Sequence, residues 1–161
     1  MQNRTLLSLV ALLAALTLSG LPDVAAGGGG GDSIPAAPED PDYAAGKQAV
    51  EAMNWQAALD AFNKVVAKDP GNANAQNYLG YTYRKSGKLD LAFKHYNEAL
   101  RLDPKHRGAR EYMGEAYLMV NNLAKAEEQL KELDRICFFG CDEYSELKKA
   151  VAEYKQKTAS K

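Results

Sequence analysis

Residues 73–106 read ANAQNYLGYTYRKSGKLDLAFKHYNEALRLDPKH, and this stretch decides the fold. Apolar and small side chains recur in it at the three- and four-residue spacing of a helix, first over 78–83 and again over 89–100. Gly87 separates the two patterns and is free to adopt the positive φ angle with which many helices end. Pro104 closes the second pattern, because the residue before a proline is biased away from the helical region. The stretch therefore predicts two helices joined by a short turn.

The same arrangement recurs along the chain with a period of 34 residues. A fixed period of this length indicates an array of structural repeats, in which each helical pair hides its apolar face against the next pair. We place the units at 39–72, 73–106 and 107–140. The positions that keep the spacing are Gly46, Gly80 and Gly114; Ala49, Tyr83 and Tyr117; Trp55, Leu89 and Leu123; Ala58, Ala92 and Ala126; Phe62, Tyr96 and Leu130; and Pro70 with Pro104.

These units resemble the tetratricopeptide repeat family. The middle unit matches the family pattern at Leu79, Gly80, Tyr83, Gly87, Ala92, Tyr96, Ala99 and Pro104. The outer units depart from it: Ala45 replaces the leucine of the first unit, and Phe138 stands at the closing proline position of the third. The resemblance covers residues 39–140. It implies an all-α fold, a right-handed superhelical stack of three helix-turn-helix hairpins.

The recurring small residues have an expected structural role. Glycine inside a helix costs about 1 kcal/mol relative to alanine, so its presence needs a packing reason. We expect Gly80 and Ala92 to let the two backbones of one hairpin approach closely. A larger side chain at either position would overpack the crossing and cost roughly 1–3 kcal/mol.

A last helix is expected over 142–157, and a disordered tail over 158–161. Asp142 is suited to cap the helix N-terminus. The apolar stripe consists of Tyr144, Leu147, Val151 and Tyr154. Because a repeat stack needs a covered end, we interpret this segment as a capping helix. The alternative is a separate helix that binds a partner.

The N-terminal residues 1–26 are typical of a signal peptide: Arg4 in a short polar start, an apolar run over 6–18, and small residues before the expected cleavage site after Ala26. The run is short for a membrane span. We therefore expect an exported protein, periplasmic in a Gram-negative bacterium, with no stable membrane insertion after cleavage. The alternative is an uncleaved helical anchor.

Residues 27–41 contain five consecutive glycines and three prolines, and such a composition predicts a flexible tether. The folded domain is accordingly expected at 42–157. Its composition is ordinary for a globular protein, and the formal charge of -1 gives no sign of nucleic-acid binding.

Cys137 and Cys141 are the only cysteines. In an exported protein such a pair predicts a disulfide, which would fix the angle of the capping helix. The alternative is a redox role. However, three residues separate the cysteines where thioredoxin-type motifs have two. Zinc needs about four ligands, and the two histidines lie far back in the chain, so we expect no metal and no cofactor.

The resemblance implies a concave groove lined by the first helix of each unit, with a peptide or protein as partner. Asparagine amides can bond a ligand backbone, tyrosines supply contact area, and Arg84 could pair a carboxylate. The alternative is an ordinary exposed helical surface. A clamp for a terminal carboxylate is not expected, because Glu111 and Glu115 stand where it needs cations. The predicted binding residues are Tyr43, Lys47, Asn74, Asn77, Tyr81, Arg84, Glu111, Tyr112 and Glu115.

No catalytic constellation or phosphate-binding loop is recognisable in the sequence, so an enzyme is not expected. Three functional hypotheses remain open. The first is an interaction scaffold that binds a peptide or protein segment in its groove. The second is a thiol-linked role through Cys137 and Cys141. The third is a structural subunit whose repeats stack on another copy or on an envelope assembly, which makes a homo-oligomer possible. Met53 and Trp55 could mediate such stacking.

Overall fold

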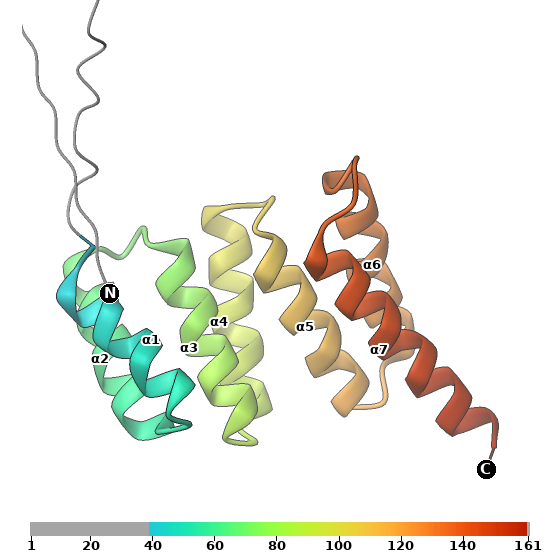
Figure 1. Ribbon diagram of the computed structural model, residues 1–161, viewed down its shortest axis with the longest axis horizontal. Helices are drawn as coiled ribbons and strands as arrows, with labels where there is room; N and C mark the ends of the chain where they lie inside the picture. Colours follow the sequence, from blue (N-terminus) through green and yellow to red (C-terminus); the bar gives the residue numbers. More distant parts are fainter. Residues whose placement is uncertain (1–38, 161) are drawn as a thin grey trace, which may run out of the picture. The chain divides into compact units, whose positions relative to one another are not determined.

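The computed structural model of the chain describes residues 39–160, which contain seven α-helices and no strand (Figure 1). The helices are α1 (Pro41–Glu51), α2 (Trp55–Lys68), α3 (Ala73–Lys85), α4 (Leu89–Leu102), α5 (Arg107–Met119), α6 (Leu123–Ile136) and α7 (Asp142–Ala159). The expected all-α class is confirmed. The predicted signal peptide, and the predicted tether up to residue 38, lie outside the described residues. None of the seven helices combines the length and the apolar character that crossing a membrane requires.

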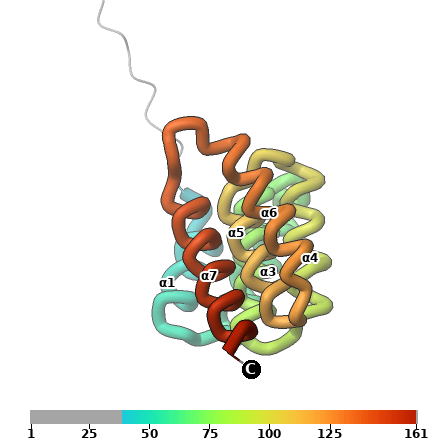
Figure 2. The backbone as a smooth tube through the Cα atoms, turned by 90° about the vertical axis from the view of Figure 1, so that its right-hand side faces the viewer, coloured from blue at the N-terminus to red at the C-terminus, as the bar shows by residue number. Residues whose placement is uncertain are grey.

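The helices form two layers, which Figures 1 and 2 show from perpendicular directions. One layer, called the first layer below, contains α1, α3, α5 and α7. The second layer contains α2, α4 and α6. Each helix packs on the next one in the sequence, and α7 packs on both α5 and α6. The three short turns at 52–54, 86–88 and 120–122 join the helices of one pair.

Those turns share a left-handed residue. Gly87 has a φ of +74°, which confirms the prediction for the middle unit. Thirty-four residues to either side, Met53 and Asn121 have φ angles of +53° and +57°. Such angles suit glycine and cost other residues about 1–2 kcal/mol, asparagine less than most. The period of the sequence is therefore a period of backbone conformation as well.

Side-chain caps begin most of the helices. The Oδ1 atoms of Asn54, Asn72 and Asn122 accept backbone N–H bonds at the starts of α2, α3 and α6. The expected capping of α7 by Asp142 is wrong. Cys141 holds the cap position and makes no side-chain cap bond, while Asp142 is the first helical residue. Its negative charge still favours a helix N-terminus.

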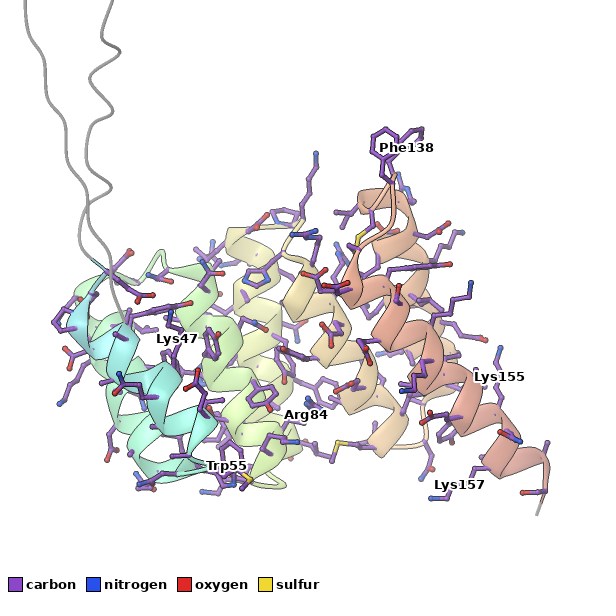
Figure 3. The ribbon with its side chains drawn as sticks, viewed as in Figure 1. Lys47, Trp55, Arg84, Phe138, Lys155 and Lys157 are labelled. Carbon is purple, nitrogen blue, oxygen red and sulfur yellow. A yellow bond between two sulfur atoms is a disulfide. The ribbon has the colours of Figure 1, made fainter. Side chains whose placement is uncertain are left out.

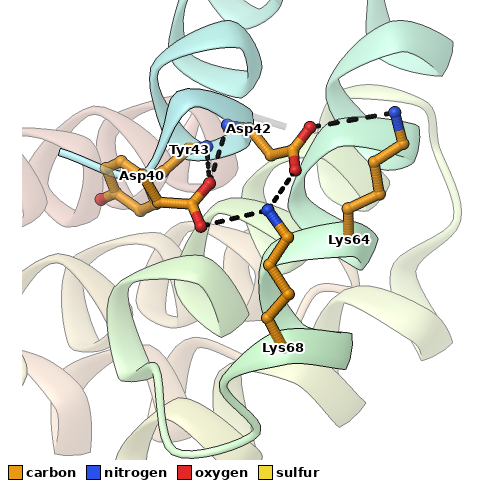
Figure 4. A network of polar contacts seen from close by, with 5 residues as sticks. All are labelled: Asp40, Asp42, Tyr43, Lys64 and Lys68. Atoms are coloured by element: carbon orange, nitrogen blue, oxygen red, sulfur yellow. Dashed lines mark hydrogen bonds and ion pairs between the residues drawn. The ribbon is translucent and has the colours of Figure 1, made fainter.

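The first helix begins within the stretch predicted as tether. Asp40 caps α1 through Oδ1, which accepts the backbone N–H groups of Asp42 and Tyr43 at 2.7 and 3.2 Å. Lys68, at the end of α2, holds both aspartates through Nζ, 3.3 Å from Asp40 Oδ2 and 2.5 Å from Asp42 Oδ2 (Figure 4). Lys64 lies 3.8 Å from Asp42. These contacts tie the start of α1 to the end of α2.

The repeated glycines make room for side chains, which corrects the expectation of a backbone crossing. A Cβ on Gly46 would lie 2.6 Å from the Phe62 ring, and one on Gly80 would lie 2.5 Å from the Tyr96 ring. Both rings are fully buried. Gly46 and Gly80 therefore each receive an aromatic ring from the second-layer helix of their own pair.

The third unit breaks this rule. The space at Gly114 is filled by Leu147 of α7, 2.5 Å from where a Cβ would lie, instead of by Leu130 of α6. Leu147 is fully buried and Leu130 is only partly buried. The helix α7 thus completes the core of the third unit. It runs to Ala159, two residues beyond the predicted end.

Candidate functional site

The nine predicted binding residues all lie on first-layer helices α1, α3 and α5, and we call this set the first-layer strip. Their accessibility differs. Asn77 and Arg84 are buried, and the other described members are partly or fully exposed. Because the second layer covers the opposite side of these helices, the strip is the part of the first layer that a ligand could reach without unfolding the stack.

Aromatic rings meet at the centre of the strip. The ring centroids of Tyr81 on α3 and Tyr112 on α5 lie 5.0 Å apart. Trp55, the first residue of α2, approaches Tyr81 edge-on at 6.4 Å. The Arg84 guanidinium lies 5.4 Å from both tyrosine centroids, within cation–π distance. Figure 3 labels Trp55, at the start of α2, and Arg84, near the end of α3. Trp55 therefore borders the first-layer strip, and its part in stacking on another copy stays a prediction.

Arg84 already has a carboxylate partner within the chain. Its Nη1 lies 2.5 Å from Glu115 Oε2 on α5, and the Arg84 side chain is only 10% exposed. Its Nε has no hydrogen-bond partner among the described residues. A carboxylate of a ligand, which the sequence suggested as the partner of Arg84, would have to compete with Glu115. In this structure Arg84 joins α3 to α5 and positions the two tyrosine rings.

Asn74 is held by a histidine that the sequence analysis did not single out. His106 caps α5: its Nδ1 accepts the backbone N–H of Ala109 at 3.1 Å. The proton of the neutral ring is therefore on Nε2, which donates to Asn74 Oδ1 at 3.0 Å. Burial lowers the pKa of His106 below 6.5, because desolvation disfavours the charged ring. The amide of Asn74 remains available through its NH₂ group.

A shallow pocket of about 420 Å³ opens at the start of the strip, a size within the range of ligand-binding pockets. Tyr43, Lys47, Asn74 and Tyr78 line it together with Glu39 and Asp40. Lys47 Nζ lies 2.8 Å from Glu39 Oε1 and 5.6 Å from the Tyr43 ring centroid. Burial raises the pKa of Tyr43 to about 12, so its hydroxyl stays a hydrogen-bond donor at neutral pH.

Glu111 ionises with difficulty. Its pKa is raised from 4.5 to about 7, first because the carboxyl is partly buried and next because of the negative charges on Glu115 and Glu143. Glu146 adds to the same effect, and the Arg84 charge opposes it. Two of these glutamates belong to α7, so the capping helix brings negative charge to the strip. Among residues 39–160, no three acidic, histidine or cysteine side chains are grouped closely enough to hold a metal ion.

Two family models, both described as tetratricopeptide repeat, match residues 43–107 and 83–136, which together span 43–136. The chain belongs to the tetratricopeptide repeat family. A search of curated protein sequences found no match.

Solved structures share the tetratricopeptide fold with this chain at low sequence identity. The TPR2B domain of yeast Sti1, in a pHsp70 complex, has a TM-score of 0.66 and 20% identity over 72% of this chain and 94% of its own. The first such domain of Spaghetti (RPAP3), bound to the HSP90 peptide SRMEEVD, has 0.65 and 18% over 73% and 90%. The Yersinia enterocolitica secretion chaperone SycD, in complex with a peptide of the translocator YopD, has 0.63 and 20% over 73% and 92%. At these identities the likeness concerns the fold.

The tetratricopeptide array ends in a disulfide loop. Cys137 and Cys141 lie at bonding distance, 2.03 Å between Sγ atoms, and no other cysteine occurs. Between them Phe138 and Phe139 are 85% and 96% exposed, and Gly140 turns the chain with a φ of +85°. Figure 3 shows Phe138 projecting away from the helices. The predicted pairing is present, and its effect is a small rigid loop before α7.

Sequence reasoning missed three members of the tetratricopeptide site. His106 lies 34 residues after the helix cap Asn72, and that spacing could have identified it as the cap of α5. Glu143 and Glu146 reach the strip only because α7 docks on α5 through Leu147. No pattern in the local sequence around Glu143 predicts that contact.

Proposed function

We propose that this tetratricopeptide protein is a non-catalytic interaction scaffold that binds a peptide or protein segment along its first-layer strip. The observation that supports this most is the aromatic centre, where Trp55, Tyr81 and Tyr112 gather beside Arg84. Aromatic side chains supply large contact areas while losing little conformational entropy, which is why they dominate binding sites for peptides.

The surroundings of this centre suit an extended chain. The pocket at Tyr43 and Lys47 lies at one end of the strip. A second hollow, lined by Asn74, His106, Gly108 and Glu143 among others, lies between α3, α5 and α7. Asn74 borders both, so the two hollows are adjacent. A segment crossing them would meet amide and hydroxyl groups that can bond its backbone. The related structures bound to peptides lend support to this use of the fold.

The proposal also includes a cellular location. The N-terminal residues 1–26 have the composition of a cleaved signal peptide, and a glycine- and proline-rich segment follows. A disulfide accords with an oxidising compartment. We therefore propose action in the periplasm, by a stack of three hairpins and a capping helix on a tether. The right-handed sense of the superhelix stays part of this proposal.

A capture experiment with matched tyrosine variants tests the function. The full chain, exported by its host and immobilised, is used to retain proteins from a cell-envelope extract. Replacing Tyr81 and Tyr112 with alanine should abolish retention while the helical circular dichroism stays unchanged. Tyr154→Ala is the control, because this tyrosine lies on α7 and bonds Asn121 outside the strip. Equal retention by the double variant and the wild type would refute the proposal.

A structural subunit is the second candidate, and the exposed pair Phe138 and Phe139 favours it. Two large apolar side chains in water are unusual on a monomeric protein and mark contact sites. Sedimentation at several concentrations tests this hypothesis. Wild-type association that disappears on replacing both residues with serine would support it, and a monomer at all concentrations would exclude self-assembly.

A further inference from the structure

The helix α5 begins at a cap whose charge can change. His106 holds the cap position, and its Nδ1 accepts the backbone N–H of Ala109 at 3.1 Å. Thirty-four residues earlier, Asn72 caps α3 through Oδ1, which accepts the backbone N–H of Ala75 at 2.9 Å. An asparagine oxygen accepts at any ordinary pH, whereas a histidine nitrogen accepts only while it carries no proton. The start of the third unit therefore depends on a titratable side chain.

The same imidazole ring joins two helices. Its Nε2 donates to Asn74 Oδ1 at the start of α3 at 3.0 Å. The ion pair of Arg84 with Glu115 also links α3 to α5, but Arg84 lies near the far end of α3. The bond from His106 therefore holds together the ends at which these two first-layer helices begin.

Protonation of His106 would break both contacts. A protonated Nδ1 carries a hydrogen and cannot accept the N–H of Ala109. The positive ring would also lie at the N-terminus of α5, where the helix dipole already places partial positive charge. Both nitrogens belong to one rigid ring, so turning Nδ1 away from α5 displaces Nε2 from Asn74. Acid would thus remove the cap and the link to α3 in one step.

A hollow beside the ring gives it room to turn. This hollow has a volume of about 260 Å³, and the charged side chains that line it with His106 are Asp103 from the turn before α5, Lys105, Arg107 and Glu143 of α7. From α3 the ring faces the uncharged Asn74. The two carboxylates attract a protonated ring, and the two cations repel it. Burial, the largest cause, keeps the pKa of His106 below 6.5, although Asp103 and Glu143 act in the opposite direction.

We propose that His106 is an acid-sensitive cap that fastens the third unit to the second when it is neutral and releases α5 from α3 when it is protonated. In the unfolded chain this histidine binds a proton near pH 6.5, and in the folded chain only at a lower pH. Between these values the unfolded state holds more protons, so stability falls as the pH falls. The stabilisation is complete above about pH 6.5 and is lost as the pH drops through the folded-state pKa of His106.

The first-layer strip crosses this joint, because Asn74 lies on α3 and Tyr112 lies on α5. Loosening α5 from α3 changes the spacing of the side chains that a bound segment would contact. A segment held along the strip should therefore be released in acid. This consequence rests on the proposed function, whereas the acid-sensitive cap itself does not.

Urea denaturation of the full chain at pH 7.5 and pH 5.0 tests the cap. His106→Asn is the matched variant, because asparagine keeps a cap acceptor, as Asn72 does, and does not titrate. Between the two pH values, the folding equilibrium constant of the wild type should fall about fivefold more than that of His106→Asn, the size expected for the loss of one N-cap. The groups His95 and Glu111 titrate in both proteins, so their effects cancel in the comparison. Equal losses in the two proteins would overturn the proposal.

Nuclear magnetic resonance of the wild type follows the ring directly and does not depend on the folding of any variant. The ring carbon Cε1 of His106 and the backbone amide of Ala109 should titrate with one common midpoint below pH 6.5. The side-chain amide of Asn74 should change with them. An Ala109 amide that stays unchanged while the ring takes up its proton would show that protonation does not release the cap.

Elution of proteins captured from a cell-envelope extract separates the cap from the proposed function. A partner that leaves the wild type at pH 5.0 and stays on His106→Asn would support both proposals. A partner that stays on both proteins, while the ring and the Ala109 amide titrate together, would refute release in acid and keep the cap. Absence of any captured partner at pH 7.5 would count against the proposed function alone.

Discussion

Leu147 of α7 fills the space in front of Gly114 of α5, and its Cδ2 lies 2.5 Å from where a Cβ on that glycine would be. In the first two units the corresponding space receives an aromatic ring from the same hairpin. The third unit therefore depends on the capping helix for its core. The same docking carries Glu143 and Glu146 to the strip, so one packing contact controls both stability and the charge of the proposed site.

A double-mutant cycle tests this contact. Gly114→Ala should lower the free energy of unfolding by roughly 1–3 kcal/mol through overlap with Leu147, and Leu147→Ala should lower it by about 2–5 kcal/mol through a cavity. The double variant should cost less than the sum, because the new methyl group enters space that the leucine vacates. Urea denaturation measures all three values. Additive values would show that the two residues do not share this space.

Two helical glycines make a matched pair for the aromatic packing. In Gly80→Ala the new methyl group would meet the buried Tyr96 ring at 2.5 Å, so the free energy of unfolding should fall by roughly 1–3 kcal/mol. In Gly108→Ala the nearest atom is the Asn77 amide nitrogen at 3.2 Å, and the better helix propensity offsets the crowding. We expect this variant within about 1 kcal/mol of the wild type. Equal effects in urea denaturation would refute the assigned role of Gly80.

At the left-handed turn positions, introducing glycine and removing glycine should change the free energy of unfolding in opposite directions. Met53→Gly should raise the free energy of unfolding by about 0.5–1 kcal/mol, because methionine at a φ of +53° is strained. Gly87→Ala should lower it by about 1 kcal/mol, because alanine is strained at the φ of +74° that Gly87 adopts. Thermal unfolding followed by circular dichroism measures both shifts. A lower melting temperature for Met53→Gly would show that its side chain stabilises the turn.

Replacing Glu111 with a neutral side chain should stabilise the fold to an extent that depends on pH. Its pKa is raised in the folded chain, so the folded state holds a proton between about pH 4.5 and 7 that the unfolded chain releases. Ionisation of Glu111 therefore destabilises the fold as the pH rises through this window. Glu111→Gln should raise the free energy of unfolding at pH 8 by about 1–2 kcal/mol, a value reduced for the partial exposure of the carboxyl. At pH 4 the gain should disappear, and a gain of equal size at both pH values would contradict this cause.

Reduction of the disulfide should loosen α7 without unfolding it. The bond closes a loop of five residues at 137–141, for which chain entropy allows about 2 kcal/mol of stabilisation. Leu147 and Val151 are packed in the core, and we expect them to stay there after reduction. Hydrogen exchange should therefore accelerate first in the loop and the first turn of α7. Mass spectrometry of protein from its native compartment checks the premise, and two free thiols there would show that the bond does not form in the cell.

The fold followed from the sequence because its periodic residues act locally. Gly87 and Pro104 end helices through their own backbone restrictions, and the period of 34 repeats those restrictions. The family and the helical class were predicted on this basis and are confirmed. The exact cap residue of a helix was harder to predict. The sequence suggested Asp142 as the cap of α7, and the structure has Cys141, one residue earlier, in that position.

The candidate site could be predicted only as a set of positions. Which helices carry it follows from the period, but the contacts of its side chains depend on how neighbouring helices are rotated. The ion pair of Arg84 with Glu115 is one example, and the packing of Asn77 against Gly108 is another. In each case the two residues are more than 30 positions apart in the sequence. Binding by the strip, export and the periplasmic location stay predictions.

Photocrosslinking from inside the strip tests the central claim most directly. A photoreactive benzoyl-phenylalanine is placed at position 81 in the exporting cell, and in a second strain at position 91, where Leu91 is exposed on the second-layer helix α4. We predict a covalent adduct with another polypeptide from position 81 and none from position 91. Adducts from position 91 alone, or none from position 81 in folded protein, would contradict the account.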